Sequence, residues 1–251
     1  DTSSGIVVAG SLTIESGTIE AAAYAEQNSE PVSGAIVVQS KGTLNIRGGS
    51  VTAAGTHKNG VYVLNNFQMT GGSLKVTGSG KPGIENVGSF ELSGGTISTK
   101  SNSDGIGFLQ RGGSATIQAK ELNTDRLYIN GNSSFTVARG GKVTSGSTRI
   151  DSGTLINAGE FVSNGPFVKN EKGTFINTGT ISGTGSLPDD VKQIPDNITV
   201  YTAEISADYR DNMSINVQNL AAIQKPVNAG NLQYELAEYT GSESKGEGTI
   251  D

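Results

Sequence analysis

The sequence offers few side chains for acid–base or nucleophilic catalysis, and its only histidine is His57. This residue lies in the polar segment "AAGTHKNG", so a zinc site built from three histidines is impossible. A catalytic pair of nucleophile and base would have to use this one imidazole ring. The absence of cysteine excludes disulfides and thiolate metal sites. We therefore expect His57 to be a solvated loop residue, and we expect no catalytic residue, metal or cofactor.

A glycine-rich segment at residues 78–83, "GSGKPG", matches the GxGxxG pattern of nucleotide-binding loops. The segment contains Pro82, and no helical pattern comes after it. A bound phosphate would therefore have no helix N-terminus to contact. The segment is more typical of a corner between two strands.

Acidic residues raise the main enzymatic alternative, a polysaccharide lyase or a glycoside hydrolase. Such enzymes need carboxylates on neighbouring elements, to hold calcium or to flank a glycosidic bond. Glu15 and Arg47 occupy equivalent repeat positions and are expected to form an ordinary exposed ion pair. In "KELNTDR", Glu121, Asp125 and Arg126 lie close in sequence and are the best candidates for a catalytic groove. This alternative stays open beside a non-enzymatic function.

Internal repeats indicate the elements that must position these side chains. One phrase recurs as "GSLTIESGTIE", "GTLNIRGGSVT", "FQMTGGSLKVT" and "GSFELSGGTIS". Its first apolar position is occupied by Leu12, Leu44, Phe67, Phe90, Ala115 and Phe135. Its second is occupied by Ile14, Ile46, Met69, Leu92, Ile117 and Val137. A glycine-led apolar segment, such as "GAIVV" or "NGVYV", precedes each phrase, so each repeat supplies three short apolar segments.

Three such short strands cannot form independent sheets, but they can form the sides of a coil. Each strand then pairs in parallel with its equivalent about 4.8 Å along the axis. Apolar columns point inward and glycines lie at corners. The sequence therefore predicts an all-β fold, a right-handed single-stranded parallel β-helix of about eight coils over residues 1–184. Asn157 and Asn177 repeat at one coil's spacing and predict an amide ladder along the axis.

One outward column suggests a candidate binding face. The alternation of the glycine-led strands directs Val7, Val37 and Tyr62 outward on three successive coils. Glu85 and Gly107 are expected next in this column, so the apolar strip ends there.

An insertion at residues 20–31 carries Tyr24 beside this strip. It either folds back as a short helix or loop and covers the strip, or leaves it open. An open strip would offer Tyr62 and Tyr24 for stacking of a sugar or docking of a protein.

Composition changes near residue 186. The chain has a net charge of −6, but residues 186–251 alone carry −7, and 32 of the 36 glycines precede them. We expect a linker at residues 185–197. Segments such as "NITVYTAEISAD" and "NLQYELAEY" then alternate apolar and polar residues and predict a small β-sandwich at residues 198–251. About 100 residues make a complete immunoglobulin-like sandwich, so this one is expected to be partial.

The phrases "SGGTIS" and "NGVYV" over residues 1–184 resemble the glycine-rich β-helix regions of large bacterial surface and adhesin-like proteins. The second part is similar to the opening strands of the immunoglobulin-like modules that follow such repeats. The resemblance implies a non-enzymatic stalk or contact rod on the cell surface or secreted, whose partners are glycans or host surface proteins.

Other partner classes are not expected. A near-neutral rod and an acidic tail argue against nucleic acid. No apolar run approaches the roughly 18 residues of a spanning helix, so we expect no membrane insertion. We also expect a monomer. The opening "DTSSGIVVAG" matches the middle of a repeat, which suggests a fragment whose export signal and anchor lie elsewhere.

Overall fold

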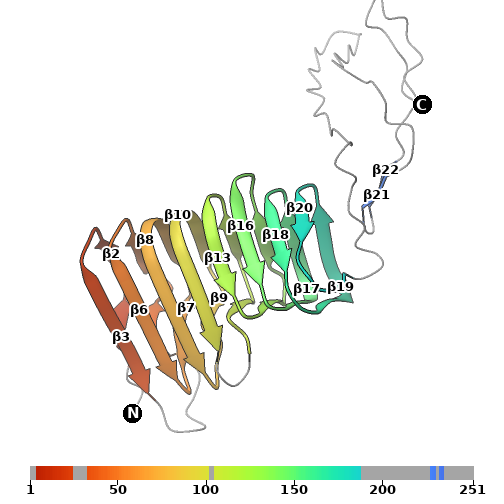
Figure 1. Cartoon of the computed structure of the whole chain (residues 1–251). Coiled ribbons are helices and arrows are strands. Elements are labelled where there is room, and N and C mark those ends of the chain that lie inside the picture. The colour runs from red at the N-terminus through yellow and green to blue at the C-terminus, as the bar shows by residue number, and fades with distance from the viewer. Residues whose placement is uncertain (1–3, 25–32, 102–104, 188–226, 230–231, 235–251) are drawn as a thin grey trace, which may run out of the picture. The chain divides into compact units, whose positions relative to one another are not determined.

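The computed structural model describes residues 4–24, 33–101, 105–187, 227–229 and 232–234. The regular elements within these residues are all β-strands, and the strands up to β20 join one sheet through parallel pairing. The chain winds through this sheet as a parallel β-solenoid (Figure 1). The predicted parallel β-helix is confirmed, while its right hand and its total of about eight coils stay predictions.

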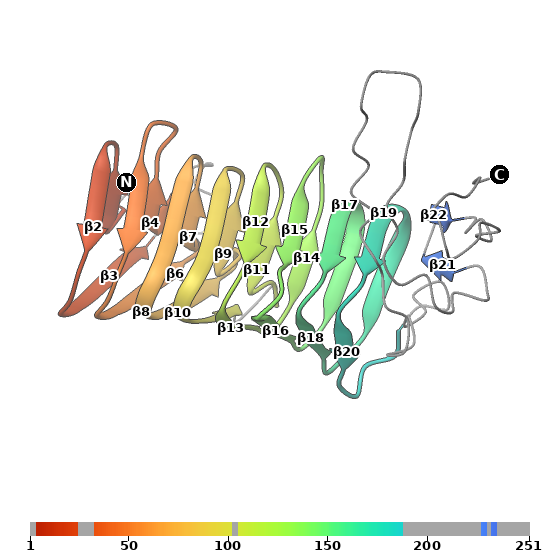
Figure 2. The ribbon, with the colours of Figure 1, turned by 90° about the horizontal axis from the view of Figure 1, so that it is seen from above.

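Each turn contributes strands to three faces. The first face contains β1 (Ile6–Val8), β4 (Gly34–Val38), β7 (Asn59–Val63), β9 (Ile84–Asn86), β11 (Phe108–Gln110), β14 (Leu127–Ile129) and the beginnings of β17 (Thr148–Asn157) and β19 (Phe167–Asn177). Figure 2 shows successive turns lying side by side along the solenoid.

The second face contains β2 (Ser11–Ile14), β5 (Thr43–Ile46), the beginnings of β8 (Asn66–Ser79) and β10 (Ser89–Ser101), β12 (Ser114–Ile117), β15 (Ser134–Val137) and the ends of β17 and β19. The third face contains β3 (Thr18–Tyr24), β6 (Ser50–Thr56), the ends of β8 and β10, β13 (Lys120–Thr124), β16 (Gly141–Ser145), β18 (Glu160–Ser163) and β20 (Thr180–Ser182).

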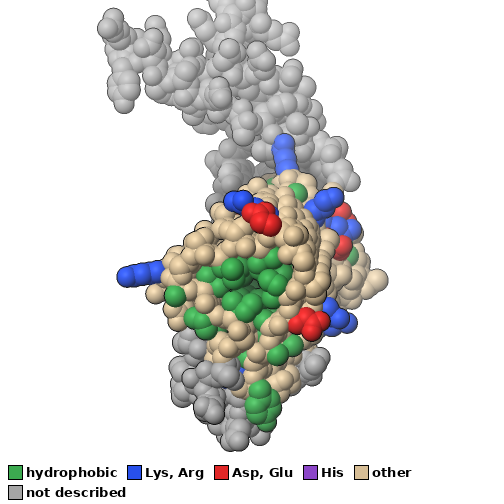
Figure 3. Space-filling view, turned by 90° about the vertical axis from the view of Figure 1, so that its left-hand side faces the viewer, with side chains coloured by type: hydrophobic (Ala, Val, Ile, Leu, Met, Phe, Trp, Pro, Cys, Tyr) green, Lys and Arg blue, Asp and Glu red, His purple; other side chains and the backbone are tan. Residues whose placement is uncertain are grey.

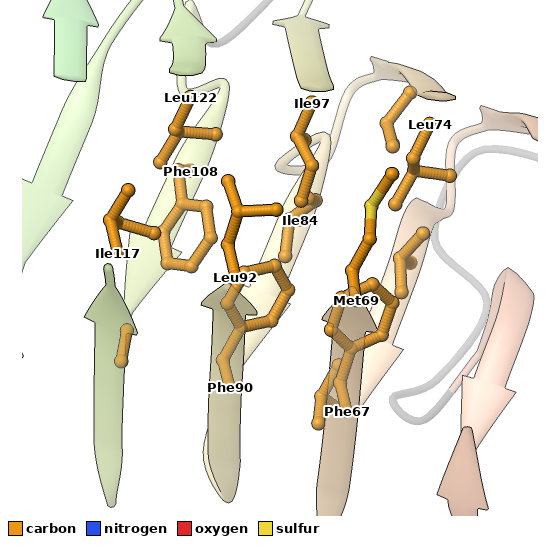
Figure 4. Close-up of a cluster of buried hydrophobic side chains, with 14 of the residues drawn as sticks. Phe67, Met69, Leu74, Ile84, Phe90, Leu92, Ile97, Phe108, Ile117 and Leu122 are labelled. Atoms are coloured by element: carbon orange, nitrogen blue, oxygen red, sulfur yellow. The ribbon is translucent and has the colours of Figure 1, made fainter. Parts of the chain in front are cut away.

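The apolar columns predicted for the recurring phrase form the inner side of the second face. The register pairs Leu12, Leu44, Phe67, Phe90, Ala115 and Phe135 in succession. The rings of Phe67 and Phe90 stack with centroids 4.3 Å apart, and Phe108 from the first face meets Phe90 edge-on at 5.1 Å (Figure 4). Buried aromatic contacts of this kind stabilise the stacking of successive turns.

Glycines form the corner between the second and third faces. Gly49, Gly72 and Gly95 have φ angles of 79°, 78° and 81°, in the left-handed region that favours glycine. A Cβ atom on Gly72 would lie 2.6 Å from the carbonyl oxygen of Gly49 on the preceding turn. The "GG" of the repeated phrase is therefore required both by backbone conformation and by close stacking.

Amide side chains form ladders inside the solenoid. Asn157 Nδ2 donates to Asn177 Oδ1 at 2.7 Å, which confirms the predicted ladder along the axis. Asn86 Nδ2 makes an equivalent bond to Gln110 Oε1 at 2.9 Å. These buried amides therefore have a structural role, because buried polar groups need hydrogen-bond partners.

The sequence-based register was wrong for β11. The structure pairs Ile84 with Phe108 and Glu85 with Leu109, so Leu109 and not Gly107 follows Glu85 in the outward column. Gly105 and Gly107 each precede an apolar residue. The sequence is therefore compatible with two registers for this strand, which differ by two residues. The buried Asn86–Gln110 bond fits only the observed one.

Part of the expected insertion is a strand. Residues 20–24 continue β3 and pair with β6, so that Ala21 lies beside Ala53. Ala21 and Ala23 are buried because alternate residues of this strand point inward. Residues 25–31 of the insertion lie outside the described residues.

The N-terminal end of the solenoid exposes part of its interior. Ile6, Leu12 and Ile19 are only partly buried, whereas Leu44, the partner of Leu12 on the next turn, is fully buried. Figure 3 views this end and shows hydrophobic side chains surrounded by backbone and other side chains. Burial of each turn's apolar residues is thus completed by its neighbours.

The chain divides into two compact units, residues 1–191 and 192–251. In the second unit, β21 (Val227–Ala229) and β22 (Leu232–Tyr234) pair antiparallel, and Val227 lies opposite Tyr234. Most of the expected linker at 185–197 and of the expected sandwich at 198–251 lies outside the described residues, so both stay predictions. No helix long and apolar enough to cross a membrane occurs in the described part of the chain.

Candidate binding face

The four residues predicted to form a binding strip differ in exposure. Val7, Val37 and Tyr62 do occupy one column on successive turns of the first face. Val7 and Tyr24 are 52% and 62% exposed, but Val37 and Tyr62 are only 3% and 8% exposed. The structure therefore does not present these side chains as one open surface, and their role in binding stays a prediction.

Tyr62 belongs to a polar cluster on the first face. Glu85, its neighbour on the next turn, accepts hydrogen bonds from Asn59 Nδ2 at 3.0 Å and from Arg111 NH1 at 2.8 Å. Burial, reinforced by the negative charge of Glu85, raises the pKa of Tyr62. Within this cluster the Glu85 carboxylate is satisfied by protein groups.

A second cluster links later turns of the first face. Asp151 accepts hydrogen bonds from Tyr128 Oη at 2.5 Å, Arg149 Nε at 2.7 Å and Asn170 Nδ2 at 2.5 Å. The Arg149 hydrogen bond is the main reason why the pKa of Asp151 is lowered. Arg149 also lies over the Tyr128 ring, 5.6 Å from its centroid. Residues from three successive turns are thereby tied together.

The candidate catalytic residues have structural partners. Glu121 lies on the third face and accepts a hydrogen bond from Thr144 Oγ1 at 2.9 Å. Asp125 accepts hydrogen bonds from the backbone N–H groups of Ser101 at 2.8 Å and Arg126 at 2.9 Å. Glu121 lies within β13, whereas Asp125 lies at the bend that follows this strand.

The other candidate motifs lie at corners. His57 is half-buried, has a φ of 55° and donates its backbone N–H to Ser79 O at 2.6 Å. The "GSGKPG" segment joins the end of β8 to the start of β9, as predicted for a corner. Glu15 and Arg47 form the expected exposed ion pair at 3.0 Å. Among the described residues, no group of three or more metal-ligating side chains is present.

The outer side of the second face carries an uninterrupted polar column. Every paired residue in it has a hydroxyl or amide side chain: Ser11, Thr43, Asn66, Ser89, Ser114, Ser134, Thr154 and Thr174. All are exposed or half-exposed. None of these side chains makes a hydrogen bond within the described part of the chain. We call this set the hydroxyl column.

The next outward column is also largely uncharged. Its members are Thr13, Asn45, Gln68, Glu91, Thr116 and Thr136, and the register continues the column into Ile156 and Ile176. Glu91 is the one charged member, and its Oε1 accepts a hydrogen bond from Gln118 Nε2 at 3.0 Å. Together, the two columns present mainly hydrogen-bonding groups and one charge, because the neutral Gln118 leaves the Glu91 carboxylate without an opposite charge.

The chain matches no family model, curated protein or solved structure. The candidate face therefore depends on geometry alone. The hydroxyl column was not predicted, because only the apolar positions of the repeated phrase defined its columns. A Ser, Thr or Asn precedes that letter in every phrase, and this recurrence was the available signal.

Proposed function

We propose that the chain is a non-enzymatic surface module, a stalk or contact rod that binds its partner through the outer side of the second face. The observation that carries this proposal is the hydroxyl column, which runs from Ser11 to Thr174 across successive turns. Its side chains are accessible and have no hydrogen-bond partners in the described part of the chain. Such groups can exchange water for a ligand without breaking internal contacts.

The resemblance of the repeats supports the wider setting of this proposal. We place the module on the bacterial cell surface or in the secreted fraction, as an adhesin-like rod followed by a partial immunoglobulin-like module. Glycans and host surface proteins are the proposed partner classes. Weak contacts suit this role, because one net hydrogen bond contributes only about 0.5–1.5 kcal/mol, and many must act together.

Binding of the complete 251-residue chain to arrayed glycans and to host surface proteins tests the proposal. We expect retention on at least one partner class, with the ligand recovered unchanged. The same preparation is incubated with pectins and neutral polysaccharides while new reducing ends and unsaturated sugars are measured. Production of either would contradict a non-enzymatic function and would favour the lyase or hydrolase alternative.

A further inference from the structure

We infer that the ligand of the second face is an uncharged, extended polysaccharide that lies along the solenoid axis. This inference rests on the proposed contact function and adds the chemical class and direction of the ligand. It follows from the charges on the face, the free state of its polar groups and the direction in which they repeat.

Charge separates the second face from the third. On the second face, Glu15 and Arg47 neutralise each other, so the Glu91 carboxylate, which bonds only to the neutral Gln118, is the one uncompensated charge in the two outward columns. On the third face, Lys75 and Lys100 are exposed on adjacent turns, and neither forms an ion pair with another described residue. An acidic ligand would be attracted to these two lysines, while Glu20 and Glu121 lie on other strands of the same face. The second face, whose one uncompensated charge is a carboxylate, instead matches a ligand without charge.

The side chains of the hydroxyl column can form hydrogen bonds with the hydroxyl groups of a sugar. Ser and Thr hydroxyls both donate and accept hydrogen bonds, as the hydroxyls of a neutral sugar do. On the first face, comparable groups are already used: Asn130 Nδ2 donates to Tyr128 Oη, and Ser152 Oγ donates to Asn130 Oδ1. A ligand there would have to displace internal bonds, which the hydroxyl column does not require.

The dimensions of the second face indicate the direction in which the ligand lies. Along each strand, perpendicular to the solenoid axis, the face offers only a few outward positions, because β2, β5, β12 and β15 are each four residues long. Along the axis the hydroxyl column continues through every turn, with a repeat of about 4.8 Å. A polysaccharide is also a chain of repeated hydroxyl-bearing units. Laid along the axis, each added sugar can reach a further turn.

The length of the ligand should therefore control its affinity. Uncharged β-linked oligosaccharides of glucose, xylose and mannose, from two to eight units, are titrated into the complete chain by calorimetry. We expect affinity for at least one series to increase about two- to tenfold for each added unit over the first several units. The dissociation constant should change less than about twofold when the salt concentration is raised, since no ion pair forms.

A matched pair of variants locates the site. Ser89 and Ser114 are paired on the second face, while Ser98 and Asn123 are paired on the third face along the same two turns. The double variant S89D/S114D puts two charges in the hydroxyl column and should weaken binding of a neutral hexasaccharide about tenfold. The control S98D/N123D adds the same charges elsewhere and should leave binding unchanged. Circular dichroism melts check that both variants are folded.

Other outcomes would overturn the inference in distinguishable ways. Tighter binding of hexagalacturonate, still weakened by S89D/S114D, would refute an uncharged ligand but retain the contact face. Loss of binding only in S98D/N123D would refute the face itself. Dimerisation in sedimentation equilibrium that S89D/S114D abolishes would identify a second copy of the chain as the occupant. If no saccharide binds, the inference fails, and host-protein binding alone decides the proposed function.

Discussion

The outer sides of the first and second faces use similar polar residue types for different purposes. On the first face, Tyr128, Asp151 and Asn170 come from three successive turns and bond to one another. On the second face, Ser89 and Ser114 lie on paired strands without any side-chain hydrogen bond in the described part of the chain. These polar groups of the first face therefore hold turns together, while the hydroxyl column of the second face remains available to solvent or a ligand.

The largest effect is expected beneath the second face, at Phe90. This side chain is 1% exposed and stacks on Phe67. Replacement by alanine should destabilise the solenoid by about 3–5 kcal/mol, because it removes apolar contacts and leaves a cavity. Urea unfolding followed by circular dichroism measures this loss. A change below about 1 kcal/mol would contradict the inward register on which the assignment of the outer columns depends.

Gly72 at the corner of the second and third faces should have the next largest effect. Its φ of 78° costs an L-residue about 1–2 kcal/mol, and a Cβ would also meet the carbonyl oxygen of Gly49. We expect Gly72→Ala to lower stability by at least this amount in the same unfolding experiment. The exposed Gly10, around which a Cβ meets no atom within 4 Å, gives the control substitution Gly10→Ala. Equal effects at both glycines would contradict the stacked corner.

Asp151→Asn tests the bonded network of the first face. We expect the free energy of unfolding to fall by about 1 kcal/mol at neutral pH. The effect is limited because Arg149, the charged partner of Asp151, is largely exposed. The pKa of Asp151 is below its ordinary value of 3.8, so its contribution is present above that value and is lost as the pH falls through the lowered pKa. The stability difference between wild type and variant should therefore shrink below about pH 4. A difference independent of pH would exclude a role for the carboxylate charge.

The smallest effect is expected in the hydroxyl column. Ser89→Ala combined with Ser114→Ala removes two hydroxyls that make no hydrogen bond within the described residues, so unfolding free energy should change by less than about 0.5 kcal/mol. Chemical denaturation of this variant beside Asp151→Asn measures the contrast directly. A loss as large as that of the Asp151 variant would show that the second face also holds the turns together.

Much of the fold was predictable because the stacking of turns imposes a repeated pattern. The columns through Leu44 and Phe67 and the left-handed glycines follow from apolar spacing and corner geometry. The register of β11 was not predictable in this way, because Gly105 and Gly107 satisfy the same corner rule. The backbone pairing of Ile84 with Phe108 and the buried bond between Asn86 and Gln110 separate the two choices.

The site was less predictable than the fold. Strand alternation correctly placed Val37 and Tyr62 in one outward column with Val7, but alternation does not determine whether an outward side chain is covered. Both are buried, whereas Val7 is half exposed. Likewise, sequence shows that Ser89 and Ser114 are polar, but only the structure shows that their hydroxyls have no partner within the described residues. Exposure and free hydrogen-bonding capacity depend on packing across turns.

The most direct test of the account is to map backbone amide chemical shifts while an uncharged hexasaccharide is added to the isotope-labelled chain. We predict that shift changes concentrate on strands of the second face, such as β5, β12 and β15, and extend over several adjacent turns. Changes concentrated on β13, β16 and β18 of the third face, or confined to a single turn, would contradict an extended uncharged ligand bound along the hydroxyl column.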